Sequence, residues 1–156
     1  MTVALFNDPS RARCAREGCT RLAWEKSLHG YCRVCAGAAK DAWRSIVRQK
    51  QAEVAGRRAE AEHFLEAAEA AAEEALEAVE PGGTGAAWVE VRPANTSFAY
   101  NAKRWGWKPG PRGGVRFEVR LGSQAEREAY AVAMAAELRR CRVDAFAVLD
   151  PWGSPS

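Results

Sequence analysis

The sequence has little of what most catalytic and membrane proteins depend on. Its 156 residues include only two histidines, His29 and His63, and its apolar runs are short and rich in alanine. Such runs fall far below the roughly 20 apolar residues that a membrane-spanning helix needs. Residues 1–16 contain no apolar segment of the kind found in secretory signal peptides. We therefore expect a cytoplasmic protein.

Motifs of the common enzyme classes are also absent from the sequence. It contains no serine–histidine–aspartate set, no phosphate-binding loop with its lysine, and no acidic cluster spaced for a metal. Cys141 falls on an expected amphipathic helix and is interpreted as a small packed side chain rather than a nucleophile. The sequence therefore predicts a protein that is not an enzyme.

The net charge of +3 hides a strong segregation of charge along the chain. The local net charge is +3 for residues 1–35, +4 for residues 36–58, −8 for residues 59–80 and +4 for residues 81–156. The acidic segment has eight glutamates and neither lysine nor arginine, so it repels phosphate. A nucleic-acid partner is therefore expected to contact the N-terminal third or the C-terminal part of the chain.

Four of the five cysteines form two close pairs near the N-terminus. Four residues separate Cys14 from Cys19, two separate Cys32 from Cys35, and twelve lie between the pairs. This spacing is typical of a structural zinc site with four thiolate ligands, because each pair spans one edge of a tetrahedron. Reducing conditions favour metal binding over disulfides. We predict one structural Zn²⁺ ion held by these four cysteines.

His29 is an alternative ligand, because it lies three residues before Cys32 and zinc also accepts imidazole. The symmetry of the two pairs favours the four cysteines, and it favours zinc over an iron–sulfur cluster. Gly18 and Gly30 suit tight turns that direct backbone amides toward sulfur. Basic residues nearby stabilise thiolates; they are Arg13, Arg16, Arg21 and Arg33.

The strings Gly18-Cys19-Thr20-Arg21 and His29-Gly30-Tyr31-Cys32-x2-Cys35 resemble small treble-clef-like zinc modules. Such modules are common in phage and actinobacterial proteins, some of them HNH-type nucleases and DNA-binding proteins. The resemblance covers about residues 14–38 and implies zinc, DNA binding and a phage-encoded protein. Many members end the motif in histidine, where this chain has Cys35. The histidine and asparagine of an HNH nuclease are not recognisable downstream, which argues against nuclease activity.

Residues 36–79 contain no proline and one glycine, Gly56, and they are dominated by strong helix formers. Apolar residues recur at intervals of three, four or seven, at Trp43, Val47, Val54, Ala61, Phe64, Ala68, Ala75 and Ala78. Three arrangements are open. The helix is a long rod that pairs with a second chain as a coiled coil, an antiparallel hairpin that breaks near Gly56, or a charged helix packed on its own C-terminal domain. The first arrangement predicts a homodimer.

The remaining sequence predicts a small α+β module. Residues 81–85 indicate a flexible connector, and alternating patterns predict strands at residues 88–92 and 115–121, with a buried strand at residues 145–149. Ser123 and Glu126 have the spacing of a capping box that begins a helix over residues 124–141. The expected α+β organisation is a zinc module (1–35), a long helix or hairpin (36–80), a linker (81–87), a β-loop-β-α-β module (88–150) and a tail (151–156).

The stretch between the first two predicted strands combines aromatic and basic residues. It is more than twenty residues long and has no acidic residue between Pro93 and Phe117. A loop of that length is uncommon unless it is functional. Its composition suits single-stranded nucleic acid, whose bases stack on aromatic rings, or a protein interface; alternatively the tryptophans fill a core. The candidate binding residues are Lys103, Arg104, Trp105, Trp107, Lys108, Arg112 and Arg116.

Two functions are compatible with these patterns. The first is a non-enzymatic, zinc-containing accessory protein that binds nucleic acid or a nucleoprotein machine. The second is a regulator or inhibitor of a host or phage polymerase or nuclease, acting through the acidic helix and the tryptophan-rich loop. Steep weakening of binding with salt would indicate contacts with phosphate and distinguishes the first from the second.

Overall fold

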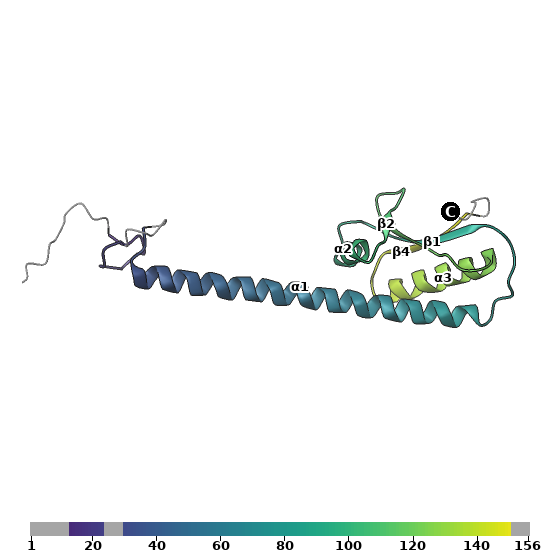
Figure 1. Cartoon of the computed structure of the whole chain (residues 1–156), viewed down its shortest axis with the longest axis horizontal. Helices are drawn as coiled ribbons and strands as arrows, with labels where there is room; N and C mark the ends of the chain where they lie inside the picture. Colours follow the sequence, from purple (N-terminus) through teal and green to yellow (C-terminus); the bar gives the residue numbers. More distant parts are fainter. Residues whose placement is uncertain (1–12, 24–29, 151–156) are drawn as a thin grey trace, which may run out of the picture. The chain divides into compact units, whose positions relative to one another are not determined.

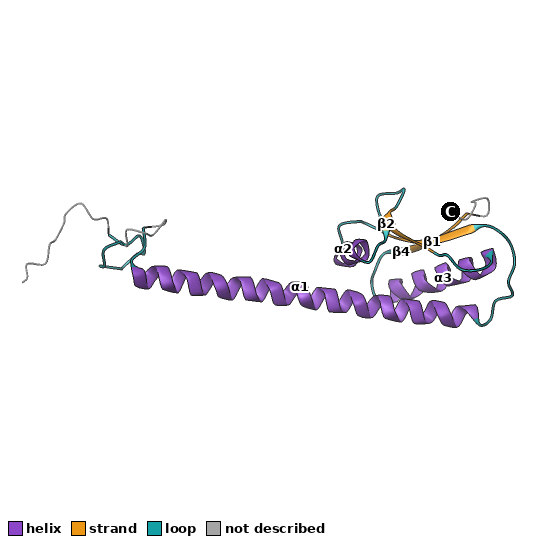
Figure 2. Cartoon of the chain, in the orientation of Figure 1, coloured by secondary structure: helices purple, strands orange, loops and turns teal. Residues whose placement is uncertain are grey.

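The computed structural model describes residues 13–23 and 30–150, and the chain divides into two compact units, Met1–Glu53 and Val54–Ser156. Helix α1 (Arg33–Leu76) contributes to both units. The later elements are β1 (Ala86–Val91), α2 (Ser97–Arg104), β2 (Lys108–Pro109), β3 (Val115–Glu118), α3 (Gln124–Arg140) and β4 (Ala145–Asp150) (Figures 1 and 2). The predicted α+β class is confirmed. His29 and the predicted tail 151–156 lie outside the described residues.

Helix α1 is continuous through Gly56, so the predicted hairpin is wrong. One glycine in a helix interior costs only about 1 kcal/mol, which the surrounding helix formers offset. In the second unit, Ala61, Ala68 and Ala72 of α1 are buried in the hydrophobic core. This part of α1 is therefore packed on its own C-terminal module, as one of the three predicted arrangements required. Among the described residues, no helix has the length and apolarity needed to cross a membrane.

The second unit is built on an antiparallel sheet with the strand order β2-β3-β1-β4. The chain order from β1 to β4 is β-α-β-β-α-β, which with this strand order is the split β-α-β arrangement. Helix α3 packs against β1 and β4, and α2 packs against β3. Figure 1 shows both helices on one side of the sheet. We call the opposite side the outer face, and no helix of the described residues covers it.

The core lies between the sheet and α3. Val89 and Val91 of β1 are fully buried, as are Met134 and Leu138 of α3. Because successive side chains of a strand point to opposite sides, these valines alternate with Trp88 and other residues that lie on the outer face. The predicted capping box is confirmed, since Ser123 and Glu126 exchange side-chain and backbone hydrogen bonds at the start of α3.

The predicted loop of more than twenty residues after the first strand is wrong, because this stretch contains α2 and β2. Thr96 begins α2 by accepting a hydrogen bond from the Ala99 N–H over 3.2 Å. Phe98, Ala99 and Ala102 give the helix a buried side. Eight residues are too few for a reliable helical pattern in sequence, so the packing of this side against the core determines the helix.

The connector between α1 and β1 is bonded to the start of α3. The Gln124 backbone N–H donates to Gly83 O over 3.2 Å, and the Gly85 N–H donates to Gln124 Oε1 over 2.9 Å. Arg127, which is buried, donates to Gly85 O over 2.9 Å. The residues predicted as a flexible linker are therefore held against the second unit at their C-terminal end.

Candidate metal centre and nucleic-acid interface

The four predicted cysteine ligands converge in the first unit. The Sγ atoms of Cys14, Cys19, Cys32 and Cys35 all lie within 4.8 Å of one another. Cys14, Cys32 and Cys35 are buried, and Cys19 is half-buried. Four sulfur atoms at this mutual distance fit a single metal ion at their centre. The cluster can therefore hold one metal ion, as the spacing of the cysteines predicted.

Local backbone geometry brings the two pairs together. Gly18 and Gly30 have φ angles of +75° and +69°, a region that glycine enters without strain. The Cys14 N–H donates to Arg21 O over 2.9 Å, and the Ala15 N–H donates to Gly30 O over 2.9 Å. These bonds fold residues 13–23 back on themselves and join them to the segment that carries Cys32.

Backbone amides also point at the sulfur atoms. The Cys32 N–H donates to Cys14 Sγ over 3.3 Å, and the Cys35 N–H donates to Cys32 Sγ over 3.4 Å. These amides lower the pKa of Cys14 and bring the pKa of Cys32 to about 6. The adjacent Cys32 sulfur raises the pKa of Cys35 to about 12, because a further negative charge there is unfavourable. A bound cation removes this conflict, since it stabilises all four groups as thiolates.

Of the two tryptophans in the predicted binding loop, Trp107 lies in the second unit's core and Trp105 packs against that core. Trp107 is only 6% exposed and packs between Phe98 and Phe117, with ring centroids 5.8 and 5.4 Å away. Trp105 is half-buried and contacts Phe98 edge to face at 5.8 Å. The prediction that Trp107 is exposed for base stacking is wrong, because α2 covers this part of the sheet and the indole fills the space between them.

The predicted basic residues remain at the surface but are not all in one place. Lys103 Nζ donates to Ala94 O over 3.1 Å and helps to anchor the segment before α2. Arg104 is exposed at the end of α2, and Arg112 is exposed in the turn between β2 and β3. Lys108 of β2 and Arg116 of β3 lie opposite each other in the strand register.

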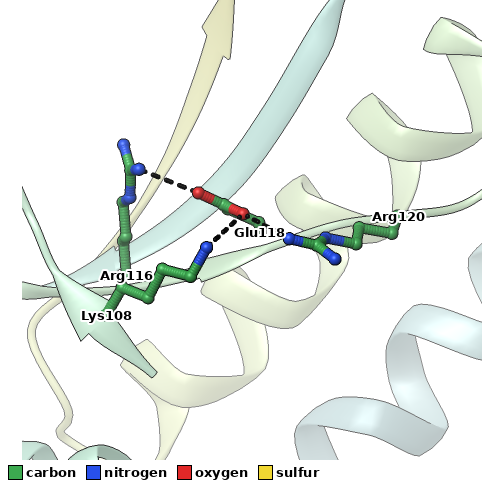
Figure 3. A network of polar contacts seen from close by, with 4 residues as sticks. All are labelled: Lys108, Arg116, Glu118 and Arg120. Atoms are coloured by element: carbon green, nitrogen blue, oxygen red, sulfur yellow. Dashed lines mark hydrogen bonds and ion pairs between the residues drawn. The ribbon is translucent and has the colours of Figure 1, made fainter. Parts of the chain in front are cut away.

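Figure 3 shows Lys108, Arg116 and Arg120 around the carboxylate of Glu118. The nitrogen–oxygen distances are 3.3 Å from Lys108, 2.8 Å from Arg116 and 3.2 Å from Arg120. The hydrogen bond from Arg120 and the bond and charge of Lys108 are the main reasons that the pKa of Glu118 is lowered. Three cations around one carboxylate leave an excess of positive charge at this position.

Four further candidate residues lie on the outer face and have no distinguishing pattern in the sequence, namely Trp88, Glu90, Arg92 and Phe146. The alternation in residues 88–92 predicted a strand whose polar side chains face water. Instead Glu90 is fully buried, with Arg92 Nε 3.5 Å from its Oε1. Only the pairing of β1 with β3 and β4 places Arg116 and Phe146 on either side of Glu90. That pairing has no signal in the local sequence.

No protein-family model, curated protein or solved structure matches the chain, and no family is identified. The function proposed below therefore depends on the cysteine cluster and on the charged surfaces of the chain itself.

Proposed function

We propose that this chain is a non-enzymatic, zinc-containing accessory protein that binds nucleic acid through its first unit. The main observation in support of nucleic-acid binding is the positive charge of that unit. In its described part every lysine and arginine is exposed, namely Arg13, Arg16, Arg21, Arg33, Lys40, Arg44, Arg48 and Lys50. Only three acidic residues, Glu17, Asp41 and Glu53, accompany them. Such a surface attracts phosphate and releases counterions when phosphate binds.

The distances within the cysteine cluster support zinc as the metal. A tetrahedron with Zn–S bonds of about 2.3 Å has sulfur–sulfur edges of about 3.8 Å. Cys19 Sγ lies 3.9 Å from Cys32 Sγ and 3.8 Å from Cys35 Sγ. Four cysteine ligands fill the coordination sphere of zinc and leave no position for substrate, so the role of the ion is structural.

The N-terminal half of α1 adds an aromatic side chain to the basic surface. Trp43 is 64% exposed and lies next to Arg44, one helical turn from Lys40. An exposed indole among cations can stack on a base while its neighbours contact phosphate. Among the described aromatic residues of the first unit, Trp43 takes the base-stacking role that the sequence had suggested for Trp107.

Fluorescence anisotropy with single- and double-stranded DNA and RNA oligonucleotides at several salt concentrations tests this proposal. We expect the triple variant Lys40→Gln, Arg44→Gln, Arg48→Gln to weaken binding, and to reduce the slope of log affinity against log salt by about 0.7 to 0.9 for each lost phosphate contact. A matched control is the triple variant Arg139→Gln, Arg140→Gln, Arg142→Gln, since these residues are exposed in the second unit. If the wild-type protein binds no oligonucleotide at low salt, the proposal is wrong.

The acidic part of α1 favours a second candidate, a regulator or inhibitor that binds a polymerase or nuclease. Exposed glutamates extend along and beyond the end of the helix, at Glu60, Glu66, Glu73, Glu74, Glu77 and Glu80. A row of carboxylates can bind the basic surface where such an enzyme binds its own nucleic acid.

Pull-down from native lysate with and without nuclease separates the candidates. Partners that survive nuclease treatment support the regulator, and complete loss of partners supports nucleic-acid binding.

A further inference from the structure

The outer face of the sheet in the second unit carries an unusual set of side chains. Strand β1 contributes Trp88 and Glu90 to this face, alternating with the buried Val89 and Val91. Pairing with β3 places Glu118 opposite Trp88 and Arg116 opposite Glu90. The helices α2 and α3 lie on the other side (Figure 1), so no described helix covers this face, although the turn at Gly110 covers Glu90.

Aromatic rings and guanidinium groups are stacked on this face. The Arg92 guanidinium carbon lies 4.4 Å from the centroid of the Phe146 ring, and that of Arg116 lies 5.8 Å from the centroid of Trp88. Phe146 is 38% exposed although it is a large apolar residue. Planar guanidinium groups and aromatic rings are the surfaces on which unpaired bases stack.

The charge of the face is complementary to a phosphate backbone. Lys108, Arg116 and Arg120 surround the single carboxylate of Glu118, as Figure 3 shows. The side chains of Lys108 and Arg120 are 56% and 66% exposed, so both remain accessible to a ligand. Around Trp88 and Glu90 the face has four cations, including Arg92, and two carboxylates, while Asp144 lies beside Arg92 and Asp150 lies at the far end of β1 and β4.

The same residues account for the buried polar atoms of the described structure that have no hydrogen bond. Five buried side-chain atoms there lack one, and they belong to Trp88, Glu90, Arg92 and Arg116. Two of the five, Glu90 Oε1 and Arg92 Nε, form an ion pair over 3.5 Å. The Glu90 side chain is 1% exposed and lies beneath the turn at Gly110, where an added Cβ would come within 2.8 Å of its Oε1. Buried polar groups without partners lower stability.

We propose that the outer face binds single-stranded nucleic acid, with a base stacked on the Arg92–Phe146 pair and phosphates at Lys108, Arg116 and Arg120. A duplex keeps its bases stacked inside, so it cannot use the aromatic surface. This inference rests on the proposed function and adds a second binding surface that selects single strands.

The test is an anisotropy titration of the full, zinc-loaded chain with a labelled single-stranded oligonucleotide and with its duplex. We expect Phe146→Leu to weaken single-strand binding about 5-fold or more, because one stacked base is lost. Arg116→Gln should lower the salt slope by about 0.7, the value for one phosphate contact on a single strand. Duplex binding should change little in either variant. The matched controls are Leu149→Ala, an exposed apolar residue of β4, and Arg140→Gln.

The outcomes separate the two proposals. If the wild type binds oligonucleotides and both outer-face variants bind like the wild type, the outer-face inference is wrong and binding by the first unit stands. If the wild type binds none, both fail. If a polyglutamate peptide binds the wild type more tightly than the oligonucleotide does, and binds Arg116→Gln weakly, an acidic protein segment is the better ligand for this face. Circular dichroism confirms that each variant is folded, and Phe146→Tyr, which keeps the ring, should bind like the wild type.

Discussion

At the scale of single residues, the tryptophans show how far composition alone can mislead. Trp107 and Trp43 both lie among basic residues in the sequence, yet Trp107 is 6% exposed and Trp43 is 64% exposed. The difference arises from packing between distant segments, since α2 covers Trp107 while the helix around Trp43 has no such cover among the described residues of its unit. Nothing in the immediate sequence distinguishes the two.

The burial of Trp107 leads to the first prediction. Trp107→Ala removes an indole from contact with Phe98 and Phe117. It should lower the free energy of unfolding of the second unit by about 3 to 5 kcal/mol. Trp43→Ala is the control and should leave this free energy unchanged. Urea denaturation followed by circular dichroism measures both, and equal stability of the two variants would contradict the placement of Trp107 in the core.

The second prediction concerns the pH dependence that Glu118 contributes. Arg120 and Lys108 lower the pKa of Glu118 in the folded state. A carboxylate with a lowered folded pKa stabilises the fold above its unfolded pKa of about 4.3, and this stabilisation is lost as pH falls through the folded value. Glu118→Gln should therefore show a smaller decrease in Tm between about pH 5 and pH 3 than the wild type. Identical Tm decreases in the two proteins would show that Glu118 contributes nothing.

At the scale of elements, the regular helices were predictable and the short ones were not. The expected helix at residues 36–79 is found as α1, Arg33–Leu76, because a long run of helix formers needs no tertiary contact to be recognised. The capping box at Ser123 likewise located the start of α3. The short α2 and β2 depend on contacts with the core and with β3, so sequence pattern did not reveal them.

The third prediction tests how α1 packs in the second unit. Ala68 is fully buried in the core, whereas Ala70, two residues later, is exposed. Ala68→Leu should lower the free energy of unfolding by about 1 to 3 kcal/mol, because three more carbon atoms must fit into a filled space. Ala70→Leu adds the same atoms on the solvent side and should have little effect. Thermal denaturation of the two variants distinguishes the sides, and a neutral Ala68→Leu would mean that α1 is not packed there.

The fourth prediction concerns the other half of α1. Trp43 and Ile46 are 64% and 53% exposed, and at a spacing of three residues they share one side of the helix. We propose that this side pairs with a second copy of the chain when nucleic acid is absent, since Trp43 cannot lie in that interface and stack on a base at the same time. The protein should then sediment as a dimer at micromolar concentration, and Ile46→Lys should shift it to monomer. A wild-type monomer at every concentration tested would exclude this pairing.

At the scale of the whole molecule, the two units are stabilised in different ways. The second unit has a continuous apolar core around Val89, Met134 and Leu138. In the described part of the first unit, the buried apolar cluster consists of cysteines, with Tyr31 packed against it. A module of this size buries too little apolar surface to fold without a metal or another staple.

The two candidate sites also differ in how much the sequence revealed. The cysteine cluster was predictable because its ligands form two close pairs, and tight turns alone bring them together. The outer face was not, because Trp88, Arg116 and Phe146 belong to three strands far apart in sequence. Their proximity follows from strand register, which depends on the whole core.

We propose that one zinc ion bound by the four cysteines organises the first unit. The most direct measurement is native mass spectrometry of the intact chain, combined with hydrogen exchange before and after chelation. We predict a mass excess of one zinc ion per chain, which the double variant Cys19→Ser, Cys32→Ser should lack. After chelation removes the zinc, hydrogen exchange should become faster in residues 13–23 and 30–35 and should stay unchanged in the second unit. A chain that carries no metal, or whose first unit keeps its slow exchange after the metal is removed, would contradict the proposal that zinc organises the first unit.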